Sequence, residues 1–112
     1  MWKSRGKVTV TTSGTPVRLT VNNSNPALYD GCHAFLVEQL PTNSGKLYIL
    51  DSQTGSKSTL TGVLAILPPP TTNILPVASI TIADAPNALN AADYWLDADN
   101  SGEGALVSVV IG

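Results

Sequence analysis

The only histidine in the chain, His33, directly follows the only cysteine, Cys32, so a cysteine–histidine nucleophile pair is the first chemistry to consider. Such a pair needs both side chains within hydrogen-bonding distance of each other. Residues 32–40 alternate as in a β-strand, in which neighbouring side chains point to opposite faces of the sheet. We therefore assign no catalysis to this pair and interpret Cys32 as a small buried apolar residue. A single cysteine also excludes an internal disulfide and a multi-cysteine zinc site.

Other catalytic patterns do not occur in the sequence. It contains no G-x-S-x-G nucleophile elbow and no phosphate-binding glycine loop. Glu38 could be a lone buried acid, but an acid–base mechanism would need a partner residue that the sequence does not place. We predict that the protein is not an enzyme, has no catalytic residues and uses no cofactor.

The acidic segment DADNSGEG, residues 97–104, is the strongest candidate for a metal site. Its beginning follows the first half of the calcium-loop pattern D-x-D-x-S-G. The position eleven residues after Asp97, where a bidentate glutamate belongs, is Ser108 within a predicted strand. Oxygen atoms in a β-loop could still hold a calcium ion, and the candidate ligands are Asp97, Asp99, Ser101 and Glu103. We favour the alternative, an acidic turn closed by Gly102 and Gly104 without a metal.

Aromatic side chains on strands could form a platform for a sugar ring, and the candidates are Trp2, Tyr29, Tyr48, Tyr94 and Trp95. Aromatic residues that alternate on strands are more often core or interface residues. Tyr94 and Trp95 are neighbours in a predicted strand, so one of them faces outward or towards a partner. A carbohydrate- or receptor-binding module is therefore the alternative function.

The net charge of −2 argues against a nucleic-acid partner, because phosphate binding needs a clustered excess of Lys and Arg. The charges are unevenly distributed along the chain. Residues 1–57 hold all six basic residues and three acidic ones, whereas residues 58–112 hold five acidic residues and no basic one. This asymmetry suits docking of one copy against another or against a larger surface. The alternative is that strands from both halves intermingle and the asymmetry disappears on folding.

The elements that must position these residues are strands. With 112 residues the chain is long enough for one domain with its own core. Period-two alternation predicts strands at residues 7–12, 16–22, 32–40, 46–51, 74–82, 94–98 and 105–111, with the apolar run 60–67 as an eighth. This pattern predicts an all-β fold, an antiparallel β-sandwich or jelly-roll-like barrel of seven to eight short strands.

Strand 32–40 is apolar on both faces, so we expect it to be central and covered on both sides. Two turns fit hairpins. PTNSG at residues 41–45 has the length and the glycine of a longer hairpin loop, with Gly45 at a positive φ. DNSGEG at residues 99–104 fits a last hairpin between the two strands at the end of the chain.

Residues 1–6 are predicted to form an N-terminal arm and residues 7–112 a single β-sandwich domain. The start of the chain lacks the apolar run of a secretory signal, and no segment reaches the roughly 18 apolar residues of a membrane helix, so we expect no membrane partner. Three consecutive prolines form an extended arm or a corner between sheets. The expected partner-contact residues are Trp2, Lys3, Arg5, Lys7, Pro68, Pro69, Pro70 and Trp95.

Four motifs follow one another along the chain. They are VTVTT at residues 8–12, GTPVRL at 14–19, QLPTNSGKLYILD at 39–51 after the strand that Cys32 opens, and SGEGALV at 101–107. This order resembles small virion proteins of tailed bacteriophages, which carry G-T-P-V-x-L, A-L-P-x-N-T-G-x-(I/V)-Y-V-G-D and N-G-E-G-V-x-Y. Ser44 replaces the usual threonine, Leu50 stands where glycine is common, and residues 52–89 do not match closely.

The resemblance implies a capsid decoration (cement) protein or a related head appendage, with a β-sandwich or jelly-roll fold and no catalytic residues. Such a protein binds the major capsid protein on the outer surface of the virion, as a dimer or trimer made in the host cytoplasm. It stabilises the capsid by binding across capsomer boundaries. The alternative within the same virion context is a carbohydrate- or receptor-binding module of a fibre or surface appendage.

Overall fold

The computed structural model of the protein describes residues 2–19, 31–70, 78–83 and 89–110. Nearly all regular structure in these ranges is β-strand, which confirms the predicted all-β class. The elements in chain order are β1 Trp2–Thr9, β2 Val17–Arg18, β3 Gly31–Cys32, β4 Ala34–Gln39, β5 Leu47–Leu50, β6 Val63–Leu67, β7 Ser79–Ala83, β8 Leu89–Asn90, the 3₁₀ turn η1 Ala91–Asp93, β9 Trp95–Ala98 and β10 Gly104–Val110. None of the described elements is a helix long and apolar enough to cross a membrane.

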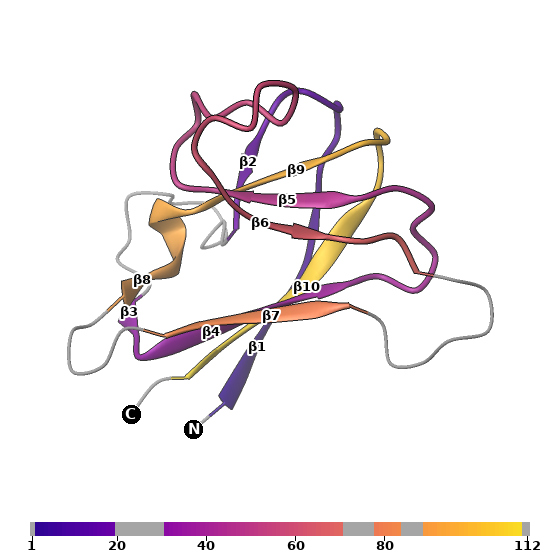
Figure 1. Cartoon of the computed structure of the whole chain (residues 1–112). Helices are drawn as coiled ribbons and strands as arrows, with labels where there is room; N and C mark the ends of the chain where they lie inside the picture. The colour runs from indigo at the N-terminus through magenta and orange to yellow at the C-terminus, as the bar shows by residue number, and fades with distance from the viewer. Residues whose placement is uncertain (1, 20–30, 71–77, 84–88, 111–112) are drawn as a thin grey trace.

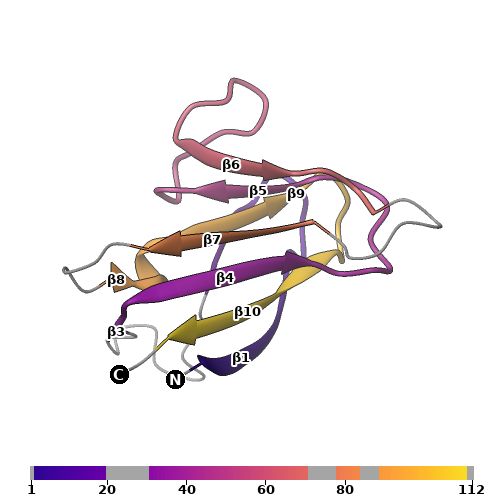
Figure 2. The same cartoon turned by 60° about the horizontal axis from the view of Figure 1, so that its bottom comes forward.

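The strands form two four-stranded antiparallel sheets that face each other (Figure 1). Sheet A has the order β1-β10-β4-β7, and sheet B has the order β2-β9-β5-β6. The short strands β3 and β8 pair separately. Figure 2 shows β1 and β6 at opposite margins of the molecule. The predicted β-sandwich is therefore confirmed.

Inward-facing residues of both sheets form one hydrophobic core. In sheet A, Phe35 and Val37 of β4 and Val107 of β10 are fully buried, while the residues that alternate with them are partly exposed. In sheet B, Leu47 and Ile49 of β5 are fully buried on the facing side. Burial with period two is what two packed antiparallel sheets impose on their strands.

The N-terminal segment differs from the predicted arm. The sequence predicts an arm at residues 1–6, but β1 begins at Trp2 and pairs with β10 as far as Thr9. The register of this pairing shifts between Ser4 and Gly6, and Gly6 has a φ of 81°. A β-bulge adds one residue and interrupts the side-chain alternation, which hides the strand from a period-two pattern.

Both predicted hairpins, at residues 41–45 and 99–104, are wrong. β4 belongs to sheet A and β5 to sheet B, so residues 41–46 cross from one sheet to the other. Residues 99–103 make the reverse crossing, from β9 in sheet B to β10 in sheet A. The length and glycine content of a loop predict that the chain turns back, but they do not say in which sheet the next strand pairs.

The covering of the central strands also differs from the prediction. β4 is central in sheet A, but Leu36 and Glu38 on its outer face are only half-buried. The strand buried on both faces is β5. The loop 51–62 covers it, since a methyl group added at Gly55 would lie 3.3 Å from the Leu50 side chain. The outer face of sheet A has no covering layer in the described part of the chain (Figure 1).

Strands from the two halves of the sequence alternate in sheet A. β1 and β4 come from the basic half, and β10 and β7 come from the acidic half. The alternative prediction, that the halves intermingle, is confirmed for this sheet. What persists locally is a basic edge, because Lys3, Arg5 and Lys7 are all exposed on β1.

Candidate functional site

Three turns meet at one end of the sandwich and hold most of the conspicuous polar residues of the sequence. They are residues 10–16 between β1 and β2, residues 41–46 between β4 and β5, and residues 99–103 between β9 and β10. The Val10 N–H donates to the Glu103 carbonyl at 2.9 Å, and the Gly102 N–H donates to the Val10 carbonyl at 2.8 Å. We name these three turns the polar end.

Two buried amide side chains lie at the centre of the polar end. Asn43 Nδ2 donates to Gln39 Oε1 and, at 2.6 Å, to the Gly104 carbonyl. Gln39 Nε2 donates in turn to the carbonyls of Gly45 at 3.2 Å and Pro68 at 3.1 Å. Both side chains are almost inaccessible to water, so these bonds replace their hydration. Asn43 thereby fixes the first crossing turn to the start of β10.

Glu103 holds the same turn through its carboxylate. The carboxylate accepts hydrogen bonds from the Ser44 N–H at 2.8 Å, the Ser44 hydroxyl at 3.0 Å and the Gly45 N–H at 3.0 Å. Burial alone raises the pKa of Glu103, but the bonds from Ser44 and Gly45 outweigh it and leave this pKa below its ordinary value. The predicted positive φ at Gly45 is wrong. Glycine is required there because a Cβ would lie 2.9 Å from Asp99 Cβ.

Asp99 binds the strand that leaves the crossing turn. Its carboxylate accepts hydrogen bonds from the Lys46 N–H at 3.2 Å and from the Tyr48 hydroxyl at 2.8 Å. Burial, followed by the hydrogen bond to Asp99, raises the pKa of Tyr48 to about 12. The Tyr48 side chain is therefore a structural donor and offers no open ring for stacking.

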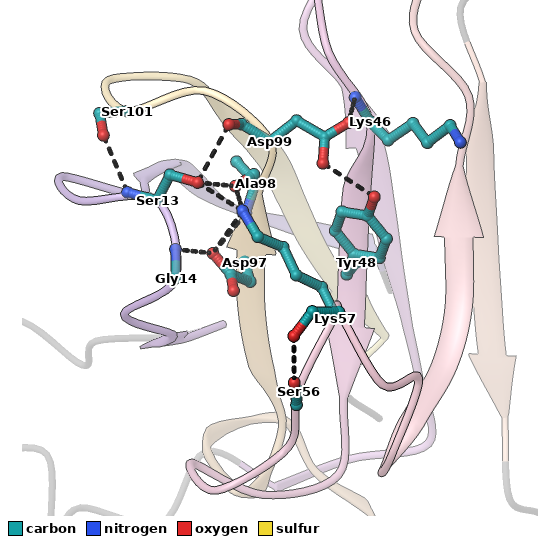
Figure 3. A network of polar contacts seen from close by, with 11 residues as sticks. Ser13, Gly14, Lys46, Tyr48, Ser56, Lys57, Asp97, Ala98, Asp99 and Ser101 are labelled. Carbon is teal, nitrogen blue, oxygen red and sulfur yellow. Dashed lines mark hydrogen bonds and ion pairs between the residues drawn. The ribbon is translucent and has the colours of Figure 1, made fainter.

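Asp97 forms a second cluster with a lysine from the loop that covers sheet B (Figure 3). Its carboxylate is 2% exposed and accepts hydrogen bonds from the Gly14 N–H at 3.0 Å and the Ala98 N–H at 2.8 Å. Lys57 Nζ lies 4.0 Å from this carboxylate and donates to the Ser13 hydroxyl and, at 2.5 Å, to the Ala98 carbonyl. The cluster fastens the covering loop to β9.

The four candidate metal ligands do not converge on a common point. Asp97, Asp99 and Glu103 face different sets of protein N–H and O–H donors, and Ser101 Oγ accepts from the Ser13 N–H at 2.8 Å. Among the residues that the structure describes, no three histidine, cysteine, aspartate or glutamate side chains lie together as metal ligands would. The segment is an acidic turn in which Gly102 has a φ of 88°.

Cys32 and His33 lie apart, as strand geometry predicts. Cys32 is buried in the core, whereas His33 is exposed. Beside the polar end lies a cleft of about 320 Å³, lined by Gly14, Pro16, Asp97 and residues 53–58. Its walls offer hydroxyls, amides, the Lys57 ammonium group and the Asp97 carboxylate. They can accept a small polar group, but they supply no aromatic face and no nucleophile paired with a base.

The predicted partner-contact residues occupy three separate places. The exposed residues Trp2, Lys3, Arg5 and Lys7 lie on β1, at one edge of sheet A. Pro68–Pro70 follow β6, at an edge of sheet B, and Pro68 is the most exposed of the three. Trp95 is half-buried on β9, with the Arg18 guanidinium 4.7 Å from the ring centroid. The structure does not bring these residues together in one surface.

The aromatic side chains form no sugar platform in the described part of the chain. Tyr94 and Trp95 point to opposite sides, as predicted, because Tyr94 packs on Phe35 in the core with ring centroids 5.0 Å apart. Trp2 is the one exposed aromatic among the described residues, with 53% of its surface accessible. Tyr29 lies outside the described residues.

Two apolar surfaces were not predicted from the sequence. The first is the outer face of sheet A, which we name the open face, and it includes Trp2, Ala34, Leu36, Leu106 and Val110. The second, which we name the β6 stripe, consists of the exposed residues Leu60, Leu64 and Ile66. A strand that is apolar on both faces predicts burial on both. Here one apolar face of β4, β6 and β10 is accessible. The sequence pattern does not distinguish such an accessible face from a buried one.

The protein is a two-sheet antiparallel β-sandwich, and the polar residues of its polar end join the turns to one another. No family model matches the sequence, and comparison with curated proteins and with solved structures finds no match either.

Proposed function

We propose that the protein is a non-enzymatic virion structural protein that binds as an oligomer across capsomer boundaries on the outside of a bacteriophage capsid. Its partners are the major capsid protein and further copies of itself. The motif order that resembles decoration proteins supports this proposal. The structural observation that carries it is the open face of sheet A, a broad surface of mixed apolar and polar side chains without a covering layer in the described residues.

The positions of the motif residues are consistent with the proposal. Asn43, Gly45 and Glu103 belong to the motifs that resemble decoration proteins, and their contacts hold the polar end. These motif residues therefore stabilise the fold, and the surfaces available for binding are the faces of the sheets. A structural virion protein needs such a scaffold and no reactive group.

The open face has the composition of an interface. One row across it consists of Trp2, Val110 and Ala34, and another consists of Lys7, Leu106 and Glu38. Leu106 is 40% exposed between a base and an acid, so the row has no net charge. Apolar patches with a polar border are typical of protein interaction sites. Between the two rows, Leu36 on β4 is flanked by Ser108 and Thr81, so apolar and polar side chains alternate across the face.

The proposed stabilisation of the capsid is the sum of many weak contacts, one set for each bound copy. A specific interface buries roughly 800 Å² on each partner, and a single contact of this size can be weak. An oligomer that contacts two capsomers at once gains effective concentration at the second site. Occupancy of many equivalent boundaries then opposes their separation.

Cosedimentation with purified heads of the phage that encodes the chain tests the proposal. We expect the full chain to bind assembled heads and not the unassembled capsid protein. Leu106→Glu places a charge in the open face and should abolish binding, while Gln53→Glu, an equal charge change on an exposed loop residue of sheet B, should not. Equal binding by both variants would refute the open face as the docking surface.

The alternative function, carbohydrate or receptor binding, has a distinct result. Binding to a glycan array that disappears in Trp2→Ala or Trp95→Ala, without binding to heads, would favour it. Trp2 is the better placed of the two because Arg18 covers the Trp95 ring.

A further inference from the structure

The edge strand β6 differs from the other edges of the sandwich. β6 is the last strand of sheet B in the described part of the chain, so no described strand is hydrogen-bonded to one side of its backbone. Natural edge strands are usually protected by charged side chains, by prolines, by β-bulges or by being very short. β1 carries Lys3, Arg5 and Lys7, and β2 has only two residues, one of them Arg18. β7 exposes serine and threonine, but β6, with the sequence VLAIL, has no polar side chain.

β6 also exposes large apolar side chains at this edge. Leu64 is 50% exposed and Ile66 is 43% exposed, and Leu60 in the preceding turn is 57% exposed. Together with Val63 and Ala65 they line an open hollow of about 330 Å³. Exposed apolar residues gathered on one strand mark an interaction surface more often than the same residues scattered singly.

Leu60 is held in an unfavourable backbone conformation. Its φ is 58°, and it is the only residue other than glycine with a positive φ in the described ranges. A leucine in this region is strained and persists only where the surroundings fix it. Backbone bonds between Ser56 and Thr61, at 2.8 and 3.1 Å, close the turn that holds it. The turn therefore holds the Leu60 backbone in place beside β6, where its side chain is exposed.

The sequence of β6 is self-complementary in an antiparallel arrangement. If two copies of β6 lie side by side with Ala65 opposite Ala65, then Leu64 lies opposite Ile66 and Val63 lies opposite Leu67. The smallest residue falls on the twofold axis, and two branched residues of similar size meet on each side. Leu64 is the extra residue of a bulge against β5. Such a residue is left unpaired in its own sheet, and the bulge increases the local twist of the strand that the partner copy must match.

The absence of charge on β6 favours a second copy as the occupant. In a twofold contact each residue meets the equivalent surface of its partner, so a clustered charge on an edge meets the same charge. The three basic residues of β1 would repel one another in this way, whereas β6 has no charge to repel.

We propose that β6 is a self-association edge through which two copies of the chain join by antiparallel β6–β6 pairing centred on Ala65. Sheet B becomes continuous across the dimer, and the two β6 stripes lie next to each other. The dimer leaves the open face of sheet A accessible on both copies. This inference names the self-contact of the proposed oligomer, but its test needs no capsid, so its failure and a failure of head binding are separate results.

Sedimentation velocity of the full chain across roughly two orders of magnitude in concentration tests the dimer. We expect the mass to rise to twice 11.6 kDa. The double variant Leu64→Lys/Ile66→Lys should weaken self-association by about a hundredfold or more, because lysines would be buried against apolar side chains. Leu106→Lys, the same change on an exposed leucine of sheet A, should leave the dimer intact. A monomeric wild type, or a dimer unaffected by the double variant, would overturn the proposal.

Disulfide trapping tests the register and does not depend on the lysine variants folding. Directly opposed residues in an antiparallel pair have Cα atoms about 4.5–5.5 Å apart, within reach of a disulfide. A mixture of Leu64→Cys and Ile66→Cys chains should therefore form disulfide-linked heterodimers under mild oxidation. Leu64→Cys alone should link poorly, because diagonal neighbours are about 7–8 Å apart. Equal linkage in both samples, or none in either, contradicts pairing centred on Ala65.

Discussion

Replacement of Asn43 by alanine should strongly destabilise the protein without touching its surface. The Asn43 side chain is buried and supplies the donor for two acceptors, Gln39 Oε1 and the Gly104 carbonyl. In Asn43→Ala both acceptors lose their partner inside the protein, where water cannot replace it. The change therefore isolates the contact that fixes the crossing turn to β10.

The expected magnitude follows from the two unsatisfied groups. Each buried polar group that loses its partner costs about 1–3 kcal/mol, so we expect a loss of about 2–6 kcal/mol in the free energy of unfolding for the two groups. Small domains are stable by only about 5–15 kcal/mol in total. At about 4 °C per kcal/mol for a chain of this size, the melting temperature should fall by about 8–24 °C.

Urea denaturation and thermal melting followed by circular dichroism measure this loss. Thr42→Ala is the matched control, because Thr42 is an exposed neighbour in the same turn and should change stability by less than about 0.5 kcal/mol. Asn43→Asp keeps the size but removes the donor, and it should be at least as destabilising as alanine near neutral pH. The reasoning is refuted if Asn43→Ala melts within the error of Thr42→Ala.

Four other predictions concern the polar end and its neighbours. The pKa of Glu103 is lower in the folded protein than its ordinary value of 4.5, so the stability that its ionised carboxylate contributes is complete above pH 4.5 and is lost as pH falls through the folded pKa. The urea midpoint should therefore decline less steeply with acid in Glu103→Gln than in the wild type, and equal slopes would contradict the assignment. Gly104→Ala would place a Cβ 2.8 Å from the Val8 carbonyl carbon and 2.9 Å from Thr9 Cα, so limited proteolysis should cut near β1, whereas Thr42→Ala, at an exposed position of the crossing turn, should stay protected. Tyr48→Phe should remove a phenol that ionises near pH 12 from the ultraviolet titration and lower stability by about 1 kcal/mol, while loss of a group titrating near pH 10 would be the contrary result. Chelation with EDTA should leave the melting temperature unchanged, and a drop of several degrees would restore a metal role for Asp97 and Asp99.

Local alternation was sufficient to predict most of the strands. Val37 and Val107 face the core, and their neighbours in sequence face outward. This alternation follows from strand geometry alone. β1 was predicted too short because its bulge near Gly6 interrupts the alternation. The two crossing turns were taken for hairpins because the choice between sheets depends on packing between distant strands.

The candidate site was less predictable than the strands. The sequence places Asp97 and Asp99 in an acidic turn, but not their partners. Lys57 reaches the Ala98 carbonyl across 41 positions of sequence, and Ser44 reaches Glu103 across 59. Such contacts depend on the arrangement of the two sheets, which a single sequence does not specify. The same holds for the β6 stripe, since an apolar strand has one sequence pattern whether its outer face is covered or open.

Binding of the full chain to assembled bacteriophage heads is the most direct measurement of the proposed function. Sedimentation of heads with increasing amounts of the protein should give saturable occupancy at a fixed ratio to the major capsid protein, and Leu106→Glu should abolish it. The absence of saturable binding by the wild-type protein, or full occupancy by Leu106→Glu, would contradict a capsid decoration role through the open face.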